Sequence, residues 1–506
     1  MQSKITGRIW KIAVVCWIGL GLGSLQGAEE ASLEALKAAV EQSPQDLAKR
    51  HELALAYLKQ SQVDLARAQW EAILEVDPRH AEALLALAAL QIRLGDTIGG
   101  LVRCQAAEQA HGQEARVLNE CGRIYLAAQQ LDRAEQVFQK AHQLAPQEGT
   151  ALVGLGLVAM HRKDLVAAEQ YGRQAVQADP QSVSALVFLG FIQQLRHNYQ
   201  AEATFRKALE LDPQHVEARQ RLAGLYEEQK RWEEALAQRR FLIEAAPRDV
   251  FRRMDLVGTL VRQGDLEAAQ QEAEKCVEME PQQPLARNLL GEVLLQRKKE
   301  SEAIPQFQEA IRLQPRFLLP YLHLGELYLR QQRPEEAIRS YLAALEFQPE
   351  SELIRMPLAQ AYQAQADFPA AQEVYRKILE KNPQNLIAAN NLAFLYATTG
   401  GDLEEALRLA QQAVAAAPDN PQFLDTLGWV YFRRGEWEPA VAHLEKAVQN
   451  ARQNPTLLYH LACAYEKQGR VEEALQRARA ALAAAPHFEE RADCEALVKA
   501  LEGRKP

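Results

Sequence analysis

One small residue recurs along the chain at an almost constant spacing. Twelve alanines and one glycine follow each other in steps of 34 residues, apart from one step of 33 and one step of 35. The thirteen positions are Ala66, Gly100, Ala134, Ala168, Ala201, Ala235, Ala269, Ala303, Ala337, Ala371, Ala406, Ala440 and Ala474. A fixed period of this length predicts a stacked array of similar structural units, and such an array presents a long surface rather than one central core.

Three further columns of residues divide each period into two helices. Twelve residues before most of the recurring small residues stands another Gly or Ala, often with Leu before it and Tyr three residues later, as in Leu324-Gly325 and Tyr328. These side chains share one helical face, and the small residues allow two helix backbones to approach closely. Gly-Asp steps such as Gly95-Asp96, Gly264-Asp265 and Gly401-Asp402 then predict the end of one helix and a cap for the next. Pro follows twelve residues after the marker in all but two periods and ends the second helix.

This pattern resembles the tetratricopeptide repeat (TPR) family, in which Leu-Gly, Tyr, Ala and Pro recur at these offsets with a 34-residue period. The resemblance covers residues 45–486 as thirteen tandem repeats. It implies an all-α fold, a TPR α-solenoid in which helix-turn-helix repeats form a right-handed superhelix with the first helices on its concave face. Segments 29–44 and 487–506 each contain one amphipathic helix, and we expect these helices to cover the two ends of the array.

Two repeats depart from the pattern. Gly99-Gly100 falls inside an expected second helix, and the closing Pro of that repeat is replaced by Gly112. Pro305 falls two residues after Ala303, inside another second helix. Because interior Gly and Pro weaken helices, we expect flexible points there unless packing against neighbouring repeats holds these helices.

Residues 1–28 have the features of a secretory signal peptide. Basic residues precede an apolar stretch at 12–22, and small residues follow up to Ala28. We expect cleavage near Gly27 or Ala28 and a location in the periplasm or cell envelope of a bacterium. The alternative is an uncleaved anchor, although the apolar stretch is shorter than the roughly 20 residues of a spanning helix. No second apolar segment follows, so no membrane span is expected after signal cleavage.

Five cysteines would remain after cleavage. They are Cys104, Cys121, Cys276, Cys463 and Cys494. The odd number leaves at least one thiol unpaired within the chain. The repeat positions allow Cys104 to face Cys121 and Cys463 to face Cys494, either as disulfides in an oxidising compartment or as small buried apolar residues.

The charge and the motifs argue against several functional classes. A net charge of −9 without basic blocks argues against a nucleic-acid partner. No metal-binding, nucleophile or phosphate-binding motif occurs, so we expect no enzymatic activity, no metal and no cofactor. Glu pairs such as Glu233-Glu234 recur at one repeat position, which identifies them as first-turn residues favoured by the helix dipole.

The expected concave face has two groups of candidate partner-binding residues. The residue after the first small column should point into the groove, and the column changes from apolar to acidic and then to aromatic. The candidates are Leu157 and Phe191 in the apolar group and Phe394, Trp429, Phe432 and Tyr459 in the aromatic group. Exposed aromatic clusters mark binding sites, whereas the alternative is that these side chains pack against adjacent helices.

These features predict a non-enzymatic scaffold that binds a protein or peptide partner in its concave groove. Segments Asn390–Ala393 and Leu424–Trp429 are similar to bacterial envelope TPR proteins of assembly, secretion or polysaccharide export systems. Some TPR domains hold a peptide carboxylate with Lys and Asn on successive first helices, and no repeat here has that pair. Alternatives are an adaptor tethered by an uncleaved N-terminal anchor and a glycan-binding solenoid. The sequence leaves the oligomeric state open.

Overall fold

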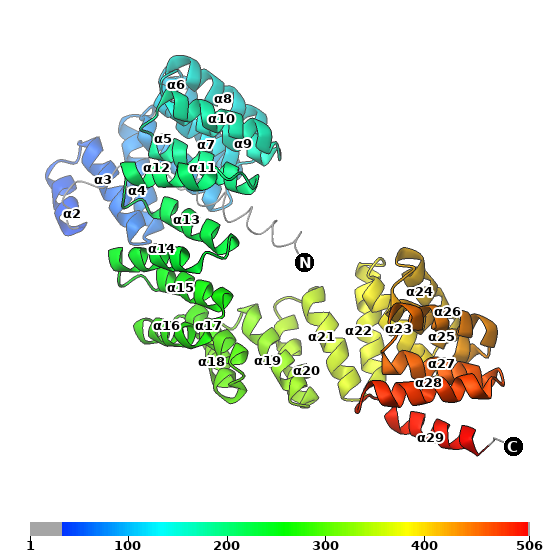
Figure 1. Cartoon of the computed structure of the whole chain (residues 1–506). Coiled ribbons are helices and arrows are strands. Elements are labelled where there is room, and N and C mark those ends of the chain that lie inside the picture. Colours follow the sequence, from blue (N-terminus) through cyan, green and yellow to red (C-terminus); the bar gives the residue numbers. More distant parts are fainter. Residues whose placement is uncertain (1–32, 504–506) are drawn as a thin grey trace. The chain divides into compact units, whose positions relative to one another are not determined.

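The chain consists of α-helices throughout the part that the structure describes. A computed structural model describes residues 33–503, which contain 28 helices and no strand (Figure 1). The chain divides into two compact halves between Gly264 and Asp265, and each half is described by itself. The expected signal peptide at 1–28 lies outside the described residues.

In the N-terminal half, α2 is followed by six helix pairs and one further helix. The helices are α2 (Leu33–Gln42), α3 (Leu47–Lys59), α4 (Val63–Val76), α5 (Ala81–Arg93), α6 (Thr97–His111), α7 (Ala115–Ala127), α8 (Leu131–Leu144), α9 (Gly149–His161), α10 (Leu165–Ala178), α11 (Val183–Leu195), α12 (Ala201–Leu211), α13 (Val216–Glu228), α14 (Trp232–Ala245) and α15 (Val250–Gln263). The two helices of each pair from α3/α4 to α13/α14 pack against each other, and each pair packs against the next. The first helix of the described residues, α2, packs against α3.

The C-terminal half repeats this arrangement. Its helices are α16 (Leu266–Met279), α17 (Pro284–Gln296), α18 (Glu300–Leu313), α19 (Leu318–Arg330), α20 (Pro334–Leu345), α21 (Glu352–Ala364), α22 (Phe368–Lys381), α23 (Leu386–Thr399), α24 (Leu403–Ala416), α25 (Pro421–Arg434), α26 (Trp437–Asn450), α27 (Pro455–Lys467), α28 (Val471–Ala484) and α29 (Arg491–Glu502). Pairs α17/α18 to α27/α28 stack in chain order, and α29 packs against α28 at the end. The all-α expectation is therefore confirmed for the described residues.

Glycines on the first helices provide space for large side chains of the second helices. A Cβ atom added at Gly154 would lie 2.3 Å from Cε1 of Phe138, and one at Gly325 would lie 2.3 Å from Cζ of Tyr341. The twelve marker alanines on the second helices are all buried. The two small columns of the sequence therefore set how closely helices pack, as predicted.

The turn inside each of the twelve helix pairs contains one residue with a left-handed backbone, and Gly264 at the end of α15 is another. Thirteen such residues follow the same period as the alanines. Five are glycines, at positions 95, 264, 400, 435 and 469, and eight are other residues: Ser61, Gln129, Lys163, His197, Lys230, Lys298, Gln332 and Ala366. The predicted caps also form, because the side chains of Asp96, Asp265 and Asp402 accept backbone N–H bonds at the starts of α6, α16 and α24.

The irregular residues lie within unbroken helices. Helix α6 includes Gly99 and Gly100, and α18 continues through Pro305. A Cβ atom at Gly100 would lie 2.7 Å from the carbonyl oxygen of Ala88 on α5, so this glycine allows a close approach of the two helices. Packing between neighbours thus holds α6 in a helical conformation in spite of its two glycines.

The five cysteines of the described part are all free thiols. The Sγ atom of Cys104 lies 3.8 Å from the carbonyl oxygen of Cys121, and the reciprocal distance is 3.7 Å. These two residues therefore face each other across α6 and α7, as the repeat positions allow. In the structure they are small buried residues rather than a disulfide.

Candidate partner-binding site

Aromatic side chains from three successive first helices meet around one histidine in the C-terminal half. His460 on α27 lies at the centre of this cluster. Its ring centroid is 4.0 Å from that of Trp429 on α25, 6.3 Å from that of Phe394 on α23 and 5.9 Å from that of Tyr459 on α27. The helices α23, α25 and α27 are in contact in chain order. We call Phe394, Trp429, Phe432, Tyr459 and His460 the aromatic cluster.

The central histidine of the aromatic cluster is paired with a buried carboxylate. The Nδ1 atom of His460 lies 2.8 Å and 3.0 Å from the two carboxylate oxygens of Asp425 on α25. The side chains are almost inaccessible, with 2% and 6% of the residue exposed for His460 and Asp425. Burial alone would lower the pKa of His460, but the charge and hydrogen bond of Asp425 outweigh it and raise the pKa above its ordinary value. The pair therefore favours an imidazolium facing a carboxylate.

The indole of Trp429 is enclosed between two other rings. It stacks on Phe432, one turn later on α25, with a centroid distance of 4.7 Å and an interplanar angle of 10°. Its other neighbour is the imidazole of His460, at an interplanar angle of 20°. Two rings therefore stack on the indole and reduce the ring surface that a sugar could contact. This arrangement does not support Trp429 as the stacking platform of a glycan-binding site.

The structure brings together all four predicted residues of the aromatic group. Phe394, Trp429, Phe432 and Tyr459 are each half-buried, so their rings both pack and contribute to the surface. Sequence reasoning missed His460 and Asp425. The available signal was their placement 35 residues apart, on the expected groove faces of two successive first helices that are otherwise mainly apolar.

The apolar group of the N-terminal half lies in a different environment. Leu157 on α9 and Phe191 on α11 are only 7% and 5% exposed. The guanidinium carbon of Arg221 on α13 lies 3.8 Å from the centroid of the Phe191 ring and covers it. A partner could reach little of these two side chains, because they take part in the core of the half.

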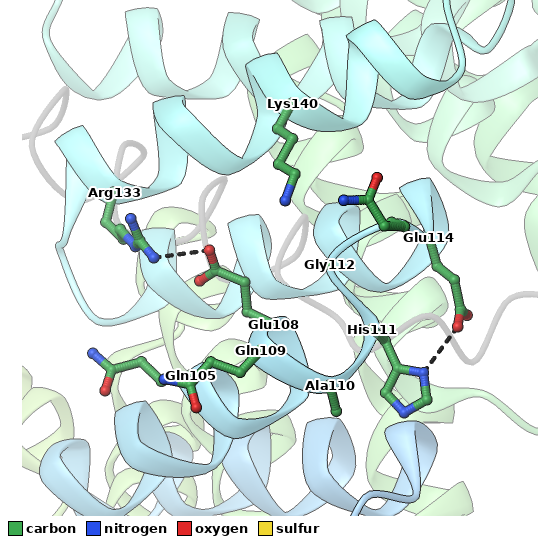
Figure 2. A pocket seen from close by; sticks show the side chains of 10 residues that line it. Gln105, Glu108, Gln109, Ala110, His111, Gly112, Glu114, Arg133 and Lys140 are labelled. Atoms are coloured by element: carbon green, nitrogen blue, oxygen red, sulfur yellow. Dashed lines mark hydrogen bonds and ion pairs between the residues drawn. The ribbon is translucent and has the colours of Figure 1, made fainter.

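The N-terminal half also contains a polar cavity of about 660 Å³. It lies where α6 ends and α7 begins, and α8 contributes Arg133 and Lys140 to its lining (Figure 2). Glu108 pairs with Arg133 at 2.8 Å, and His111 pairs with Glu114 at 2.8 Å. The lining charges therefore largely compensate each other, and no predicted binding residue lies in this cavity.

Family models match most of the repeat array. The model described as tetratricopeptide repeat matches residues 51–97, 105–183, 255–316, 301–352 and 356–421, which is more than half of the chain. The chain is a tetratricopeptide repeat protein. A second tetratricopeptide repeat model matches residues 194–250, and a model described as anaphase-promoting complex, cyclosome, subunit 3 matches residues 399–481. No curated protein matches this TPR chain.

Three solved structures are similar to this TPR protein at low sequence identity. The Cut9–Hcn1 hetero-tetramer of the APC/C has a chain that is 14% identical, with 93% of this chain and 99% of that chain covered and a TM-score of 0.41. A tetratricopeptide repeat protein from Parabacteroides merdae is 20% identical, with coverage of 50% and 98% and a TM-score of 0.42. Yeast Tom70 is 14% identical, with coverage of 77% and 96% and a TM-score of 0.35.

The TPR repeats support a general role as a protein–protein interaction scaffold. Among residues 33–503, no group of side chains is arranged to hold a metal ion. None of the helices in this range combines the length and the apolar character needed to cross a membrane.

Proposed function

We propose that this protein is a non-enzymatic TPR scaffold that holds a protein partner at the aromatic cluster of its C-terminal half. One observation supports the proposal most strongly: half-buried rings from three successive repeats lie around the buried Asp425–His460 pair. Aromatic side chains dominate the binding energy of many protein interfaces because they bury a large area with few rotatable bonds.

The buried pair explains how the rings are held for binding. The Nδ1–H group of His460 donates to the carboxylate oxygens of Asp425, which fixes the orientation of the His460 ring, and that ring stacks on Trp429. Phe432 stacks on Trp429, and Phe394 lies beside His460, so these rings are held in a fixed arrangement before a partner binds. A surface that is ordered before binding loses less conformational entropy when the partner docks.

We further propose that the mature protein acts outside the cytoplasm, in the bacterial periplasm or cell envelope. The support is the basic, apolar and small-residue order of residues 1–28. N-terminal sequencing of the protein purified from cells tests this proposal. A mature start near Ala28 or Glu29 is expected, whereas a start at Met1 in the membrane fraction would favour the tethered adaptor.

Affinity capture with the full-length protein tests the proposed binding site. Phe394→Ala and Phe432→Ala remove exposed ring surface, so each should reduce the yield of specific partners at least tenfold by quantitative mass spectrometry. The matched control is Phe368→Ala, which removes a partly exposed ring from α22, a second helix of the same half. Equal partner yields from all three variants and the wild type would refute the aromatic cluster as the binding site.

A further inference from the structure

A cysteine interrupts one of the most regular columns of the repeat array. The residue just before the small-residue column of the first helices is leucine in every repeat except one, where it is Cys121 on α7. The leucines are all buried: Leu53, Leu87, Leu155, Leu189, Leu222, Leu256, Leu290, Leu324, Leu358, Leu392, Leu427 and Leu461. Cys121 therefore replaces a large apolar side chain at a position that is otherwise constant.

A second cysteine interrupts a column of the second helices. Four residues after the marker, six repeats have a fully buried aromatic ring: Trp70, Phe138, Phe205, Phe307, Tyr341 and Tyr375. The repeat of α6 has Cys104 there instead. Where other repeats have a small apolar residue at this position, it is alanine, at 273, 410 and 478. Small size alone thus does not require cysteine, and the reactivity of the thiol is what distinguishes Cys104.

The two cysteines face each other where α6 packs against α7. The Sγ atom of Cys104 lies 3.8 Å from the carbonyl oxygen of Cys121, and the reciprocal distance is 3.7 Å. Each thiol therefore points toward the backbone of the other residue, and both residues are completely buried. A disulfide needs this arrangement, because cysteines whose side chains point apart cannot be bridged without movement of the backbone.

The thiols of Cys104 and Cys121 are also in direct contact. The pKa of the Cys121 thiol is raised above its ordinary value, first by a hydrogen bond with the Cys104 thiol and second by burial. A thiol with a raised pKa stays protonated, whereas the thiolate is the reactive form. The packed helices therefore bring the two sulfur atoms together but keep them unreactive, so oxidation requires α6 and α7 to separate briefly or to be still folding.

Helix α6 has features that favour such a separation. It contains Gly99 and Gly100, which lower its intrinsic helix stability, and its repeat lacks the closing proline. Packing against α5 and α7 holds this helix in place. Segments that depend on packing in this way open locally at a lower free energy than the rest of a structure. A covalent bond between α6 and α7 would restrict that opening.

The other pair of cysteines that the repeat positions place together is arranged differently. The Sγ atom of Cys494 on α29 lies 3.4 Å from the carbonyl oxygen of Ala478 on α28. The thiol of Cys463 on α27 forms a hydrogen bond with Tyr459 on the same helix. These two thiols therefore point at different neighbours, and the pair provides a comparison within the same chain.

We propose that Cys104 and Cys121 form a disulfide that joins two neighbouring repeats when the protein enters an oxidising compartment. The inference rests on the proposed location outside the cytoplasm, because disulfides persist in such compartments and are rare in the cytosol. The bond connects residues that are 17 positions apart in the sequence and fixes α6 against α7.

The bond forms by thiol–disulfide exchange with a donor disulfide, either of a thiol oxidoreductase or of glutathione. The thiolate of one cysteine attacks the donor disulfide, forms a mixed disulfide and releases one donor sulfur. The thiolate of the other cysteine then attacks the mixed disulfide, forms the bond between Cys104 and Cys121 and releases the second donor sulfur. Two electrons pass to the donor, and its two sulfurs take up the two thiol protons.

Peptide mapping of the purified full-length protein tests the bond directly. The protein is incubated with oxidised glutathione, unfolded in the presence of N-ethylmaleimide and digested with trypsin without reduction. Trypsin cleaves after Arg103, Arg116 and Arg123, so we expect peptide 104–116 linked to peptide 117–123, two hydrogens lighter than the sum of the free peptides. Cys463 and Cys494 should be recovered with maleimide attached.

Hydrogen exchange tests whether the bond restricts α6. Exchange of α6 should be about tenfold slower in the oxidised protein than in the reduced protein, because the cross-link limits the open states. The double variant Cys104→Ala/Cys121→Ala should show no difference between oxidising and reducing buffer. The matched control Cys463→Ala/Cys494→Ala should keep both the linked peptide and the difference in α6 exchange.

Recovery of peptides 104–116 and 117–123 as separate maleimide adducts after oxidation would overturn the proposal. Linkage of Cys104 or Cys121 to any other cysteine would overturn it as well, and so would equal α6 exchange in the oxidised and reduced protein. All three results come from purified protein in a defined buffer. Failure of the proposed location is detected by N-terminal sequencing and failure of the aromatic cluster by affinity capture, so each is a separate result.

Discussion

The same repeat position carries aromatic or large apolar residues in both halves, yet the halves use it differently. Leu157 and Phe191 in the N-terminal half and Phe394 and Trp429 in the C-terminal half all follow the small residue of a first helix. The first two are buried in the core, whereas the last two are half-buried and surround His460. One sequence column thus contributes stability in one half and surface in the other.

The neighbouring side chains decide between these two outcomes. Phe191 is covered by Arg221 from the next first helix. Among the described residues, His460 is the one aromatic neighbour of Phe394, at a centroid distance of 6.3 Å, and part of the Phe394 ring stays exposed. The comparison shows that a large residue in this column becomes a candidate binding residue only where the following repeats leave it uncovered.

The largest expected effect is a difference between the two halves in how much local stability is lost when a ring is removed. Phe191→Ala should lower the local free energy of unfolding by about 4 kcal/mol, because it removes a buried ring and leaves a cavity. Phe394→Ala should lower it by about 1–2 kcal/mol, because part of that ring is already in water. Hydrogen exchange of α11 and α23 measures both, since long repeat arrays need not unfold in one step. Equal losses at the two sites would contradict the distinction.

The second-largest effect is on the stability of the C-terminal half and comes from the buried Asp425–His460 pair. His460→Leu leaves the carboxylate of Asp425 buried without its partner and should cost about 3 kcal/mol. The double variant His460→Leu/Asp425→Leu removes both charges and should be less destabilised than the single variant. Hydrogen exchange of α25 and α27 checks the order, and a double variant as unstable as the single one would show that the charges are not the cause.

The same pair predicts a pH dependence confined to the C-terminal half. Asp425 raises the pKa of His460 in the folded state above its ordinary value near 6.5, and Glu490 acts in the same direction. The resulting stabilisation is complete below the ordinary pKa and is lost as the pH rises through the raised folded-state pKa, at no more than about 1.4 kcal/mol per pH unit. The difference in α27 exchange between the wild type and His460→Leu should shrink over that range. If the difference in exchange between the two proteins did not change with pH, His460 would not be protonated in the folded state.

The smallest effect tests what covers the buried ring in the N-terminal half. Arg221→Ala uncovers Phe191 and should lower local stability by about 1 kcal/mol through lost packing and lost cation–π contact. Arg221→Lys should retain part of this stability because its chain also covers the ring. The measurement is exchange protection of α11, and identical protection in wild type and Arg221→Ala would show that the guanidinium contributes nothing.

Most of the fold can be predicted from the sequence because several weak signals of helix boundaries recur with the same period. The marker alanines, the Asp caps and the closing prolines each indicate one boundary, and their common period makes the helix pairs unambiguous. The departures were harder to interpret. Pro305 lies inside α18, and Gly100 allows α6 to approach α5, so neither residue interrupts its helix.

The candidate site was predictable only in part. The four aromatic residues could be chosen from their repeat position, but His460 looks like any isolated histidine until Asp425 is seen 2.8 Å away. The 34-residue spacing of four exposed residues on first helices can be read directly from the sequence, whereas their exposure cannot; they are Leu285, Leu319, Leu353 and Ile387. Whether the second residue of a helix is covered depends on how adjacent first helices pack, and that is a property of the assembled array.

The left-handed turn residues have a consequence for how single repeats open. A left-handed backbone costs a residue other than glycine about 1 kcal/mol or more, and eight of the twelve helix pairs carry such a residue in their turn. Packing between the two helices of the pair must offset this conformational cost of the turn. The four helix pairs with glycine in the turn carry no such cost, so a repeat with another residue there should open at a lower free energy than a comparable repeat with glycine.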